Sequence, residues 1–389
     1  MLVSALGDLL ERRVNSRPAA VARIGVGIAV MMKAIERLPA LEQLNDPEVI
    51  RVPYLADQPT LSDVPALAVV AVWLGLGAAF TLGARTTLTG SVLAVLLGLV
   101  LFSDQQLYSN HLYLLTWLVA LLVLARSGSA LSLDALRHGE APTIPAWPVA
   151  LLQLQVVVVY AYAGLTKINP EYLSGSVVAV SLRETGPLAL PTAWQSFEPM
   201  AVASMLSILT EIGIALALML PRWRRTAFVV GLGLHIVITL WLEPTLPLAI
   251  FGLMILAPYA LFLDDGRGRL VVVWDDSCGF CASWVRWFRR LDWLDALRFV
   301  PNSDHAALAA TSIARHDADR AIQVLGPEGR SEAFRGVVTV LEALPLTFLW
   351  APLLRIWPVV SVGEAVYRRV ALRRSCRMPA GQASAARTP

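Results

Sequence analysis

The sequence predicts a polytopic α-helical membrane bundle of about eight spans, followed by a small α/β domain. Hydrophobic residues make up 56% of the 389 residues and charged residues only 16%, whereas a soluble chain carries roughly 25% charged residues. Nearly all the long apolar runs lie before residue 264, and the rest of the chain is richer in charge. We therefore expect a membrane domain over 1–263, an α/β domain over 264–376 and a disordered tail over 377–389.

Eight segments approach the roughly 20 mostly apolar residues that a membrane-spanning helix needs. They are residues 19–37, 65–84, 86–102, 107–125, 147–165, 199–220, 226–243 and 245–263. The first is the weakest candidate, because Arg23 and Lys33 interrupt it. Lys33 and Lys167 are also the only lysines in the chain, beside 30 arginines.

The distribution of basic residues predicts the orientation of the bundle, because cytoplasmic loops carry an excess of Lys and Arg. With the N-terminus inside, nine arginines fall in the inner segments, and four basic residues fall in the outer loops and adjoining span ends. We therefore expect a multi-pass protein of the cell membrane with both termini cytoplasmic, although one miscounted span would move the later loops across. The formal charge of +3 and the scattered arginines argue against nucleic-acid binding.

Several polar residues interrupt the predicted spans, and polar groups inside a bilayer are costly. Asn110 and His111 begin the fourth span, Glu211 lies in the sixth, and His235 lies in the seventh. Each could simply be a hydrogen-bond partner between helices. Together with Lys167 they could instead line one polar cavity, which would satisfy His111, Lys167, Glu211 and His235 at once.

Lys167 ends the fifth span, and its position allows two interpretations. A lysine at a span end usually extends its amine to the headgroups. If the side chain faces a dry cavity instead, desolvation favours the neutral amine, which can act as a general base.

The stretches "NHLYLL", "YAYAGLTKINPEYLSG" and "GLGLHIVI" resemble the membrane domain of vitamin K-dependent gamma-carboxylases, known as the horizontally transferred transmembrane domain. The resemblance covers roughly residues 15–263. It places the family's Tyr-x-x-Ala-Gly-x-x-Lys stretch on residues 160–167, so Tyr160 begins that stretch and Lys167 is the implied base that deprotonates a vitamin K hydroquinone. The family's Asn-His pair matches Asn110 and His111, and its later membrane histidine matches His235. A membrane quinone is therefore the implied cofactor.

The chemistry implied by this resemblance starts with a hydroquinone anion that oxygen attacks, which generates a strong base. In the carboxylases that base removes a proton from a glutamate side chain, which then takes up carbon dioxide. The carboxylases continue into a large domain that helps to hold their protein substrate, and a different domain follows here. The resemblance therefore supports quinone chemistry more than carboxylation.

A pair of cysteines lies where the pattern changes, in "RLVVVWDDSCGFCASWVRWFRRLDWL". The stretch predicts a short strand, a turn and an amphipathic helix, with Cys278 and Cys281 at the strand-to-helix junction. This placement is the thioredoxin-like redox arrangement. The helix N-terminus would stabilise a thiolate on Cys278, which would attack a disulfide, and Cys281 would resolve the mixed disulfide. A zinc site using His305, His316 or Cys376 fits no standard spacing, so no metal is expected; two merely packed cysteines are the other alternative.

The same stretch resembles the DCC-type thiol-disulfide oxidoreductases over about residues 268–376. Their aspartate and two cysteines fall on Asp275, Cys278 and Cys281, while Trp274 replaces a tyrosine and Asp276 replaces a glycine. The stretch "AIQVLGPEGRSEAFRGVVTVLEALP" predicts strand, turn, strand and helix, as in that family. The apolar segment 345–360 is too short and proline-broken for a ninth span, and we expect a helix lying on the bilayer or against the bundle.

These features predict a membrane-bound oxidoreductase that exchanges thiols and disulfides with a partner protein or a small thiol. A quinone-type site in the bundle, with Lys167 as base, would be coupled to the cysteine pair. Two alternatives stay open. The bundle could be a lipid or small-molecule binding or transport module tethered to an independent oxidoreductase, or a scaffold without catalysis.

Overall fold

The computed structural model describes residues 10–55, 61–184, 189–263 and 270–373. The chain divides into two compact units, 1–263 and 264–389, which are described separately. The tail predicted over 377–389 lies outside the described residues.

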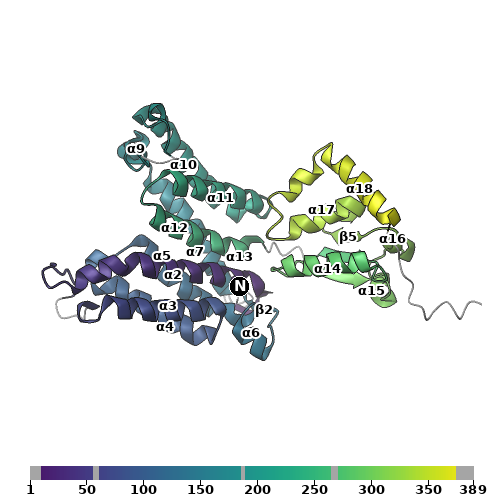
Figure 1. Cartoon of the computed structure of the whole chain (residues 1–389), viewed down its shortest axis with the longest axis horizontal. Coiled ribbons are helices and arrows are strands. Elements are labelled where there is room, and N and C mark those ends of the chain that lie inside the picture. Colours follow the sequence, from purple (N-terminus) through teal and green to yellow (C-terminus); the bar gives the residue numbers. More distant parts are fainter. Residues whose placement is uncertain (1–9, 56–60, 185–188, 264–269, 374–389) are drawn as a thin grey trace, which may run out of the picture. The chain divides into compact units, whose positions relative to one another are not determined.

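The first unit is a helical bundle, in which a helix forms within each of the eight predicted spans (Figure 1). The main helices are α2 (Arg17–Asn45), α3 (Ala66–Leu82), α4 (Thr86–Ser103), α5 (Asn110–Leu124), α7 (Ala146–Thr166), α10 (Phe197–Met219), α11 (Arg224–Trp241) and α12 (Thr245–Leu256). The last span continues from α12 through the 3-10 helix η6 (Ala257–Tyr259) into α13 (Ala260–Leu263).

Six of these spans are long and apolar enough to cross a membrane, which makes the described chain a multi-pass membrane protein. The other two predicted spans, α3 and α5, form apolar helices of 17 and 15 residues. At 1.5 Å per residue they are only about 25 and 22 Å long, against a hydrocarbon core of about 30 Å. The predicted count of eight therefore depends on these two helices, and the orientation of the termini stays a prediction.

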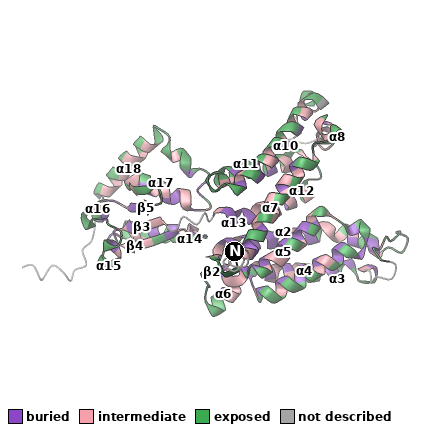
Figure 2. Ribbon diagram, turned by 180° about the vertical axis from the view of Figure 1, so that it is seen from behind, coloured by how far each residue is buried: buried purple, intermediate pink, exposed green. Residues whose placement is uncertain are grey.

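Helix α2, the weakest predicted span, is the most buried candidate span, with 61% of its most apolar window buried (Figure 2). It packs against α3, α5 and α12. Protein rather than lipid therefore surrounds the charges that interrupt it. Arg23 is fully buried and donates to the carbonyl oxygens of Ser127 at 2.5 Å and Leu131 at 2.6 Å. This guanidinium satisfies backbone groups that would otherwise lack partners in an apolar environment.

Short elements join the helices at the ends of the bundle. Strands β1 (Arg13–Asn15) and β2 (Thr143–Pro145) pair antiparallel. In helix α6 (Leu133–His138), the carboxylate of Asp134 accepts hydrogen bonds from the backbone N–H groups of Arg85 and Thr86 at the start of α4. At the end of α7 the chain turns into the short helices α8 (Pro170–Leu173) and α9 (Ser176–Val180).

The second unit is built on a mixed four-stranded sheet in the order β4-β3-β5-β6. Strand β3 (Leu270–Trp274) pairs parallel with β4 (Leu297–Pro301) and antiparallel with β5 (Gln323–Gly326), which forms a hairpin with β6 (Gly329–Glu332). Helix α14 (Gly279–Leu291) connects β3 to β4. The remaining helices are α15 (His305–Ala309), α16 (Arg315–Arg320), α17 (Ala333–Ala343) and α18 (Val359–Arg373).

Two apolar clusters pack this sheet. One contains Val272 of β3, Phe288 of α14 and Val340 of α17. The other contains Val273 of β3 and Leu308 of α15. Adjacent residues of a strand point to opposite faces, so Val272 and Val273 show that both faces of the sheet are covered. The predicted strand, helix and hairpin are therefore present, and they form a small mixed-sheet domain.

The described segment 345–360 contains no ninth span, as the sequence predicts, and in place of the single helix expected there it forms several short elements. It forms turns and the 3-10 helix η7 (Ala351–Arg355), which opens with Pro352, and Pro358 follows before α18. A proline cannot donate the backbone hydrogen bond that a helix interior requires. Trp350 and Trp357 remain 44% and 77% exposed, so contact of this segment with the bilayer stays a prediction.

Close contact between α7 and α10 depends on Gly164. A Cβ atom at this position would lie 2.7 Å from Cγ1 of Ile212 and 3.3 Å from the carbonyl oxygen of Ile208. Both neighbours belong to α10, and the second is backbone that cannot move by itself. The glycine therefore sets the distance between the two helices one turn before Lys167.

We predict that Gly164→Ala lowers the free energy of unfolding by about 1–2 kcal/mol, the cost of overpacking a close helix contact. Thermal unfolding of the purified full chain measures the change. Gly213→Ala on α10 is the matched control, since a Cβ there meets nothing within 4 Å, and it should not destabilise. Equal effects of both substitutions would contradict the role given to Gly164.

Candidate functional site

Lys167 caps the C-terminal end of α7, and its amine is held by protein. Its Nζ lies 2.5 Å from Oε1 of Glu211 on α10. The Lys167 side chain is 26% exposed and the Glu211 side chain only 7%. The Nζ also lies 5.3 Å from the ring centre of Tyr172 in α8. The structure therefore favours an amine bound inside the bundle over one that extends freely to the headgroups.

A second pair lies in the same region of the bundle. The hydroxyl of Tyr160 on α7 and Nε2 of His235 on α11 are joined by a 2.8 Å hydrogen bond, and both side chains are buried. Gly231, one turn before His235, leaves room for the ring of Tyr259, since a Cβ there would lie 2.6 Å from the Tyr259 hydroxyl. Tyr259 meets Tyr160 edge-on.

The two pairs form one cluster, which we call the membrane polar cluster: Tyr160, Lys167, Glu211 and His235. Tyr160 and Lys167 are seven residues apart and therefore lie on the same face of α7, which packs against α10, and α10 packs against α11. In the described part of the chain, Oε2 of Glu211 and Nδ1 of His235 are buried without a hydrogen-bond partner. The cluster can therefore still accept or donate hydrogen bonds at two buried atoms.

The other two predicted residues of the bundle do not join this cluster. His111 stacks on Phe251 of α12, with ring centres 4.8 Å apart, and Phe251 meets His235 edge-on at 5.5 Å. Phe251 thus contacts both histidines, and His111 has no direct contact with the cluster among the contacts described. Asn110 is exposed in the first turn of α5. Of the four residues that the sequence suggests for one polar cavity, Lys167, Glu211 and His235 therefore lie in the cluster with Tyr160, and the cavity itself stays a prediction.

Sequence reasoning missed a second charged group, in α2. Lys33 pairs with Glu36 at 2.7 Å, and Arg37 lies 3.4 Å from the same carboxylate oxygen. The signal was present, because Lys33 and Glu36 are three residues apart and share one helix face. Lys33 was considered only as an interruption of the first span.

The cysteine pair lies where β3 ends and α14 begins. Cys278 is the N-cap residue of α14, with φ −94° and ψ 112°, and Cys281 lies in the first turn. The carboxylate of Asp275 shapes the preceding turn, since its Oδ1 accepts from the Ser277 N–H at 3.0 Å and from the Ser277 hydroxyl at 2.6 Å. An aspartate that binds the backbone two residues ahead is a common turn device.

A second loop supports this turn. Oδ1 and Oδ2 of Asp276 accept from the backbone N–H and hydroxyl of Ser303, at 3.2 and 2.7 Å. The N–H of Asn302 donates to the carbonyl oxygen of Trp274 at 2.9 Å. The aspartate that replaces the family's glycine therefore ties the turn to the loop after β4.

The two thiols differ in access. Cys278 is only 2% exposed, whereas Cys281 is partly exposed. The aromatic rings of Phe280 and Trp284, on the same helix, are 50% and 43% exposed. The sequence predicts that Cys278 attacks first. In this structure that order requires the start of α14 to open, and the order stays a prediction.

The residues considered for a zinc site lie elsewhere. His305 contacts Arg315 at 3.4 Å, and His316 lies 3.2 Å from Asp317. Within the described ranges, no group of three or more His, Cys, Asp and Glu side chains is placed to hold a metal ion. Cys376 is outside those ranges.

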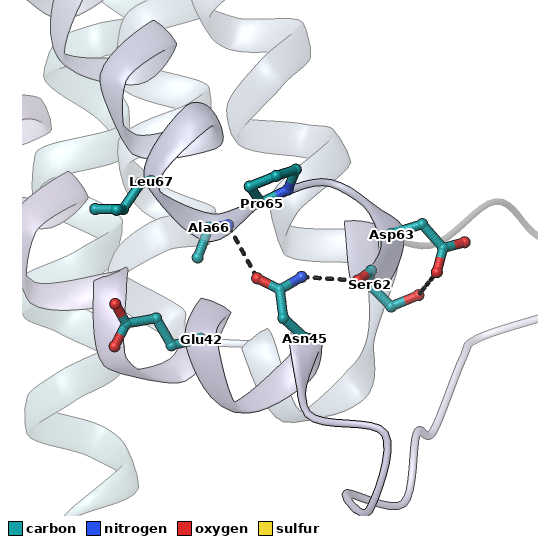
Figure 3. Close-up of a pocket in the computed structure, with 7 residues that line it drawn as sticks. All are labelled: Glu42, Asn45, Ser62, Asp63, Pro65, Ala66 and Leu67. Carbon is teal, nitrogen blue, oxygen red and sulfur yellow. Dashed lines mark hydrogen bonds between the residues drawn. The ribbon is translucent and has the colours of Figure 1, made fainter.

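A pocket of about 460 Å³ lies between the end of α2 and the start of α3, away from every predicted site residue (Figure 3). Asn45 of α2 lines the pocket and forms hydrogen bonds with residues at the start of α3 and just before it. Its Nδ2 donates to the Ser62 carbonyl at 2.7 Å, and its Oδ1 accepts from the Ala66 N–H at 2.9 Å. We interpret these contacts as a connection between the two helices rather than as a reactive site.

Comparison with known proteins identifies both units. Residues 272–378 match the DCC1-like thiol-disulfide oxidoreductase family, and residues 11–265 match the HTTM domain. A multi-pass membrane bundle joined to this second domain supports a membrane thiol-disulfide oxidoreductase. The chain belongs to the HTTM domain family, which matches more than half of its length, and both resemblances predicted from the sequence are confirmed. No curated protein and no solved structure matched the chain.

The Lys167–Glu211 pair predicts an asymmetric mutational response. Lys167→Met leaves a carboxylate that is 93% buried without its cation, which should cost about 3–5 kcal/mol of unfolding free energy. Glu211→Leu should cost less, because the partly exposed Lys167 can then extend toward the headgroups.

The double variant should recover much of the loss caused by Lys167→Met, and unfolding of all four proteins in one detergent measures this coupling. Strictly additive losses would show that the ion pair contributes nothing to the bundle.

Proposed function

We propose that the protein is a membrane-bound oxidoreductase that exchanges two electrons between Cys278–Cys281 and a thiol or disulfide partner. The observation that carries the proposal is the position of Cys278, capping α14 directly after β3, with Cys281 one turn along the same helix. Two cysteines at a strand-to-helix junction in a βαβ unit are the thioredoxin-like redox arrangement. The order β3-α14-β4, followed by a hairpin and α17, supports this assignment.

The exchange balances without a further reactant. A thiolate of the pair attacks a disulfide of the partner, which forms a mixed disulfide and releases one partner thiol. The second cysteine attacks the mixed disulfide, so the pair becomes a disulfide and the partner becomes a dithiol. The reverse sequence oxidises the partner. The turn that Asp275 shapes holds Cys278 at the start of α14.

We further propose that the membrane polar cluster is a quinone-type site coupled to the cysteines. Its residues suit such a group, since Oε2 of Glu211 and Nδ1 of His235 are buried with free hydrogen-bonding capacity, and the rings of Tyr160 and Phe251 contact His235. A bound quinone would supply a carrier of two electrons and two protons that is soluble in the bilayer. The proposed overall exchange converts two thiols and a quinone into a disulfide and a hydroquinone.

The chain's own part in this exchange is proton transfer and orientation. Lys167 is the proposed base for a bound hydroquinone: its amine becomes neutral when its proton moves to Oε1 of Glu211, 2.5 Å from its Nζ, and can then accept a proton. In the opposite direction the same pair would give a proton to a reduced quinone. The 2.8 Å bond between His235 and Tyr160 fixes the orientation of both side chains. Because Glu211 is 93% buried beside the amine, the pair can relay a proton without exposing the site to water.

Replacing either cysteine of the pair tests the exchange. Cys278→Ser and Cys281→Ser should each reduce turnover of a disulfide substrate in membranes at least 100-fold, because each leaves one thiol that cannot complete the cycle. Reduction of a small aromatic disulfide by a dithiol provides the assay. Cys376→Ser, which removes the third cysteine of the chain, is the control and should keep full activity; a similar loss there, or none in the pair, would refute the assignment.

Lys167→Met tests the coupling. In proteoliposomes, 2,3-dimethyl-1,4-naphthoquinone should oxidise the Cys278–Cys281 pair of the unchanged protein, measured by alkylation of the remaining thiols. Both carbon atoms of its quinone ring to which a thiol would otherwise add carry methyl groups, so the quinone can oxidise thiols but does not form a stable adduct with them. The substitution should slow this oxidation at least 100-fold, the usual contribution of a group that transfers a proton in the reaction, because it removes the pair that gives protons to the reduced quinone. It should leave exchange with a small dithiol unchanged.

The variant carrying Lys167→Met and Glu211→Leu checks that slow oxidation does not merely report an unstable bundle. If the fraction of reduced Cys278 and Cys281 did not change after quinone was added, the coupling would be excluded. That result would favour the alternative, in which the bundle binds or transports a small molecule independently of the oxidoreductase domain.

A further inference from the structure

Helix α2 carries a compact group of charges in the interior of the bundle. Nζ of Lys33 lies 2.7 Å from Oε2 of Glu36, and their side chains are 2% and 18% exposed. Lys33 is one of the largest fully buried side chains in the described chain. The contact is therefore a buried ion pair within one helix.

A second cation shares the same carboxylate oxygen. Nε of Arg37 lies 3.4 Å from Oε2 of Glu36, and the Arg37 side chain is 13% exposed. This Nε is buried and makes no hydrogen bond in the described structure. Two cations thus approach one anion, because the ion pairs that Lys33 and Arg37 form in the described structure are both with Glu36.

This count leaves one positive charge without a counter-ion. A buried charge that lacks a partner costs several kcal/mol, and a bundle in lipid has no bulk water to compensate it. Positive charge in excess over a buried carboxylate is the environment that binds an anion. The guanidinium and ammonium groups can donate hydrogen bonds at the same time as they compensate its charge.

We propose that Lys33, Glu36, Arg37 and His111 form a site for a small monovalent anion, such as a carboxylate, bicarbonate or chloride ion. Lys33 and Arg37 supply the positive charge, and the negative charge of Glu36 reduces the repulsion between these two cations. His111 lies in the first turn of α5, which packs against α2, and we assign it to the wall contributed by α5.

The site is distinct from the membrane polar cluster. The ring of Phe251 stacks on His111 and meets His235 edge-on, so an apolar ring lies against both histidines. Glu36 and Arg37 are partly exposed and Lys33 is fully buried, so an ion would reach the cluster from the side of Glu36 and Arg37. A small ion fits this access better than a bulky one does.

Thermal unfolding of the full chain in a maltoside detergent tests the site. Acetate, bicarbonate or chloride replaces the bulky anion isethionate at constant ionic strength and pH. At least one of these anions should raise the unfolding midpoint in a saturable way, by about 5 °C at one hundred times its dissociation constant. Equal, unsaturable responses to every anion, isethionate included, would overturn the proposal.

Variants assign the effect to the cluster. Arg37→Gln should weaken anion binding at least tenfold, and Lys33→Arg should retain it because the charge is kept. Arg51→Gln, an exposed arginine in the loop after α2, is the matched control and should bind as the unchanged protein does. Arg37 lies at the partly exposed edge of the cluster. Arg37→Gln can therefore measure anion affinity even if a substitution of the fully buried Lys33 prevents folding. Unchanged affinity in Arg37→Gln would refute the assignment.

Discussion

The ion pair between Lys167 and Glu211 is the interaction on which the arrangement of the membrane site depends. It links the end of α7 to the middle of α10, and it can form because Gly164 lets the two helices approach within side-chain reach. Once these helices are fixed, Tyr160 of α7 lies beside His235 of α11. The same rule governs the rest of the bundle, since every buried charge must find a partner inside a bilayer. Arg23 meets backbone carbonyl groups, and Lys33 meets Glu36.

Much of this organisation could be predicted from the sequence, because length and hydropathy dictate where helices cross a bilayer. The strand, turn and helix around Cys278 followed equally directly from local patterns. The meeting of side chains from different helices could not be predicted, since it depends on helix rotation and packing. His111 illustrates this limit, because it stacks on Phe251 of α12 instead of joining Lys167. The short helices α3 and α5 also show that an apolar run can exceed the helix that forms within it.

The proposed chemistry assigns different tasks to the two units. The sequence predicts that the cysteine pair lies on the cytoplasmic side and that Lys167 lies near the outer face. Direct contact between the two centres would then be impossible, and a carrier that diffuses in the bilayer would have to link them. The second unit supplies a turn held by Asp275 and Asp276 around two thiols. The bundle supplies buried atoms with free hydrogen-bonding capacity and a lysine–glutamate pair that can move a proton.

The most direct test of the central claim is a redox titration of Cys278 and Cys281 in the full-length protein. Buffers of oxidised and reduced thiols set the potential, and alkylation followed by mass spectrometry measures the fraction of each thiol. The account predicts that both thiols disappear together as one disulfide, with a tenfold change in the ratio for about every 30 mV, as expected for two electrons. Thiols that stay separate across the whole range, or that react only after a zinc chelator is added, would contradict it.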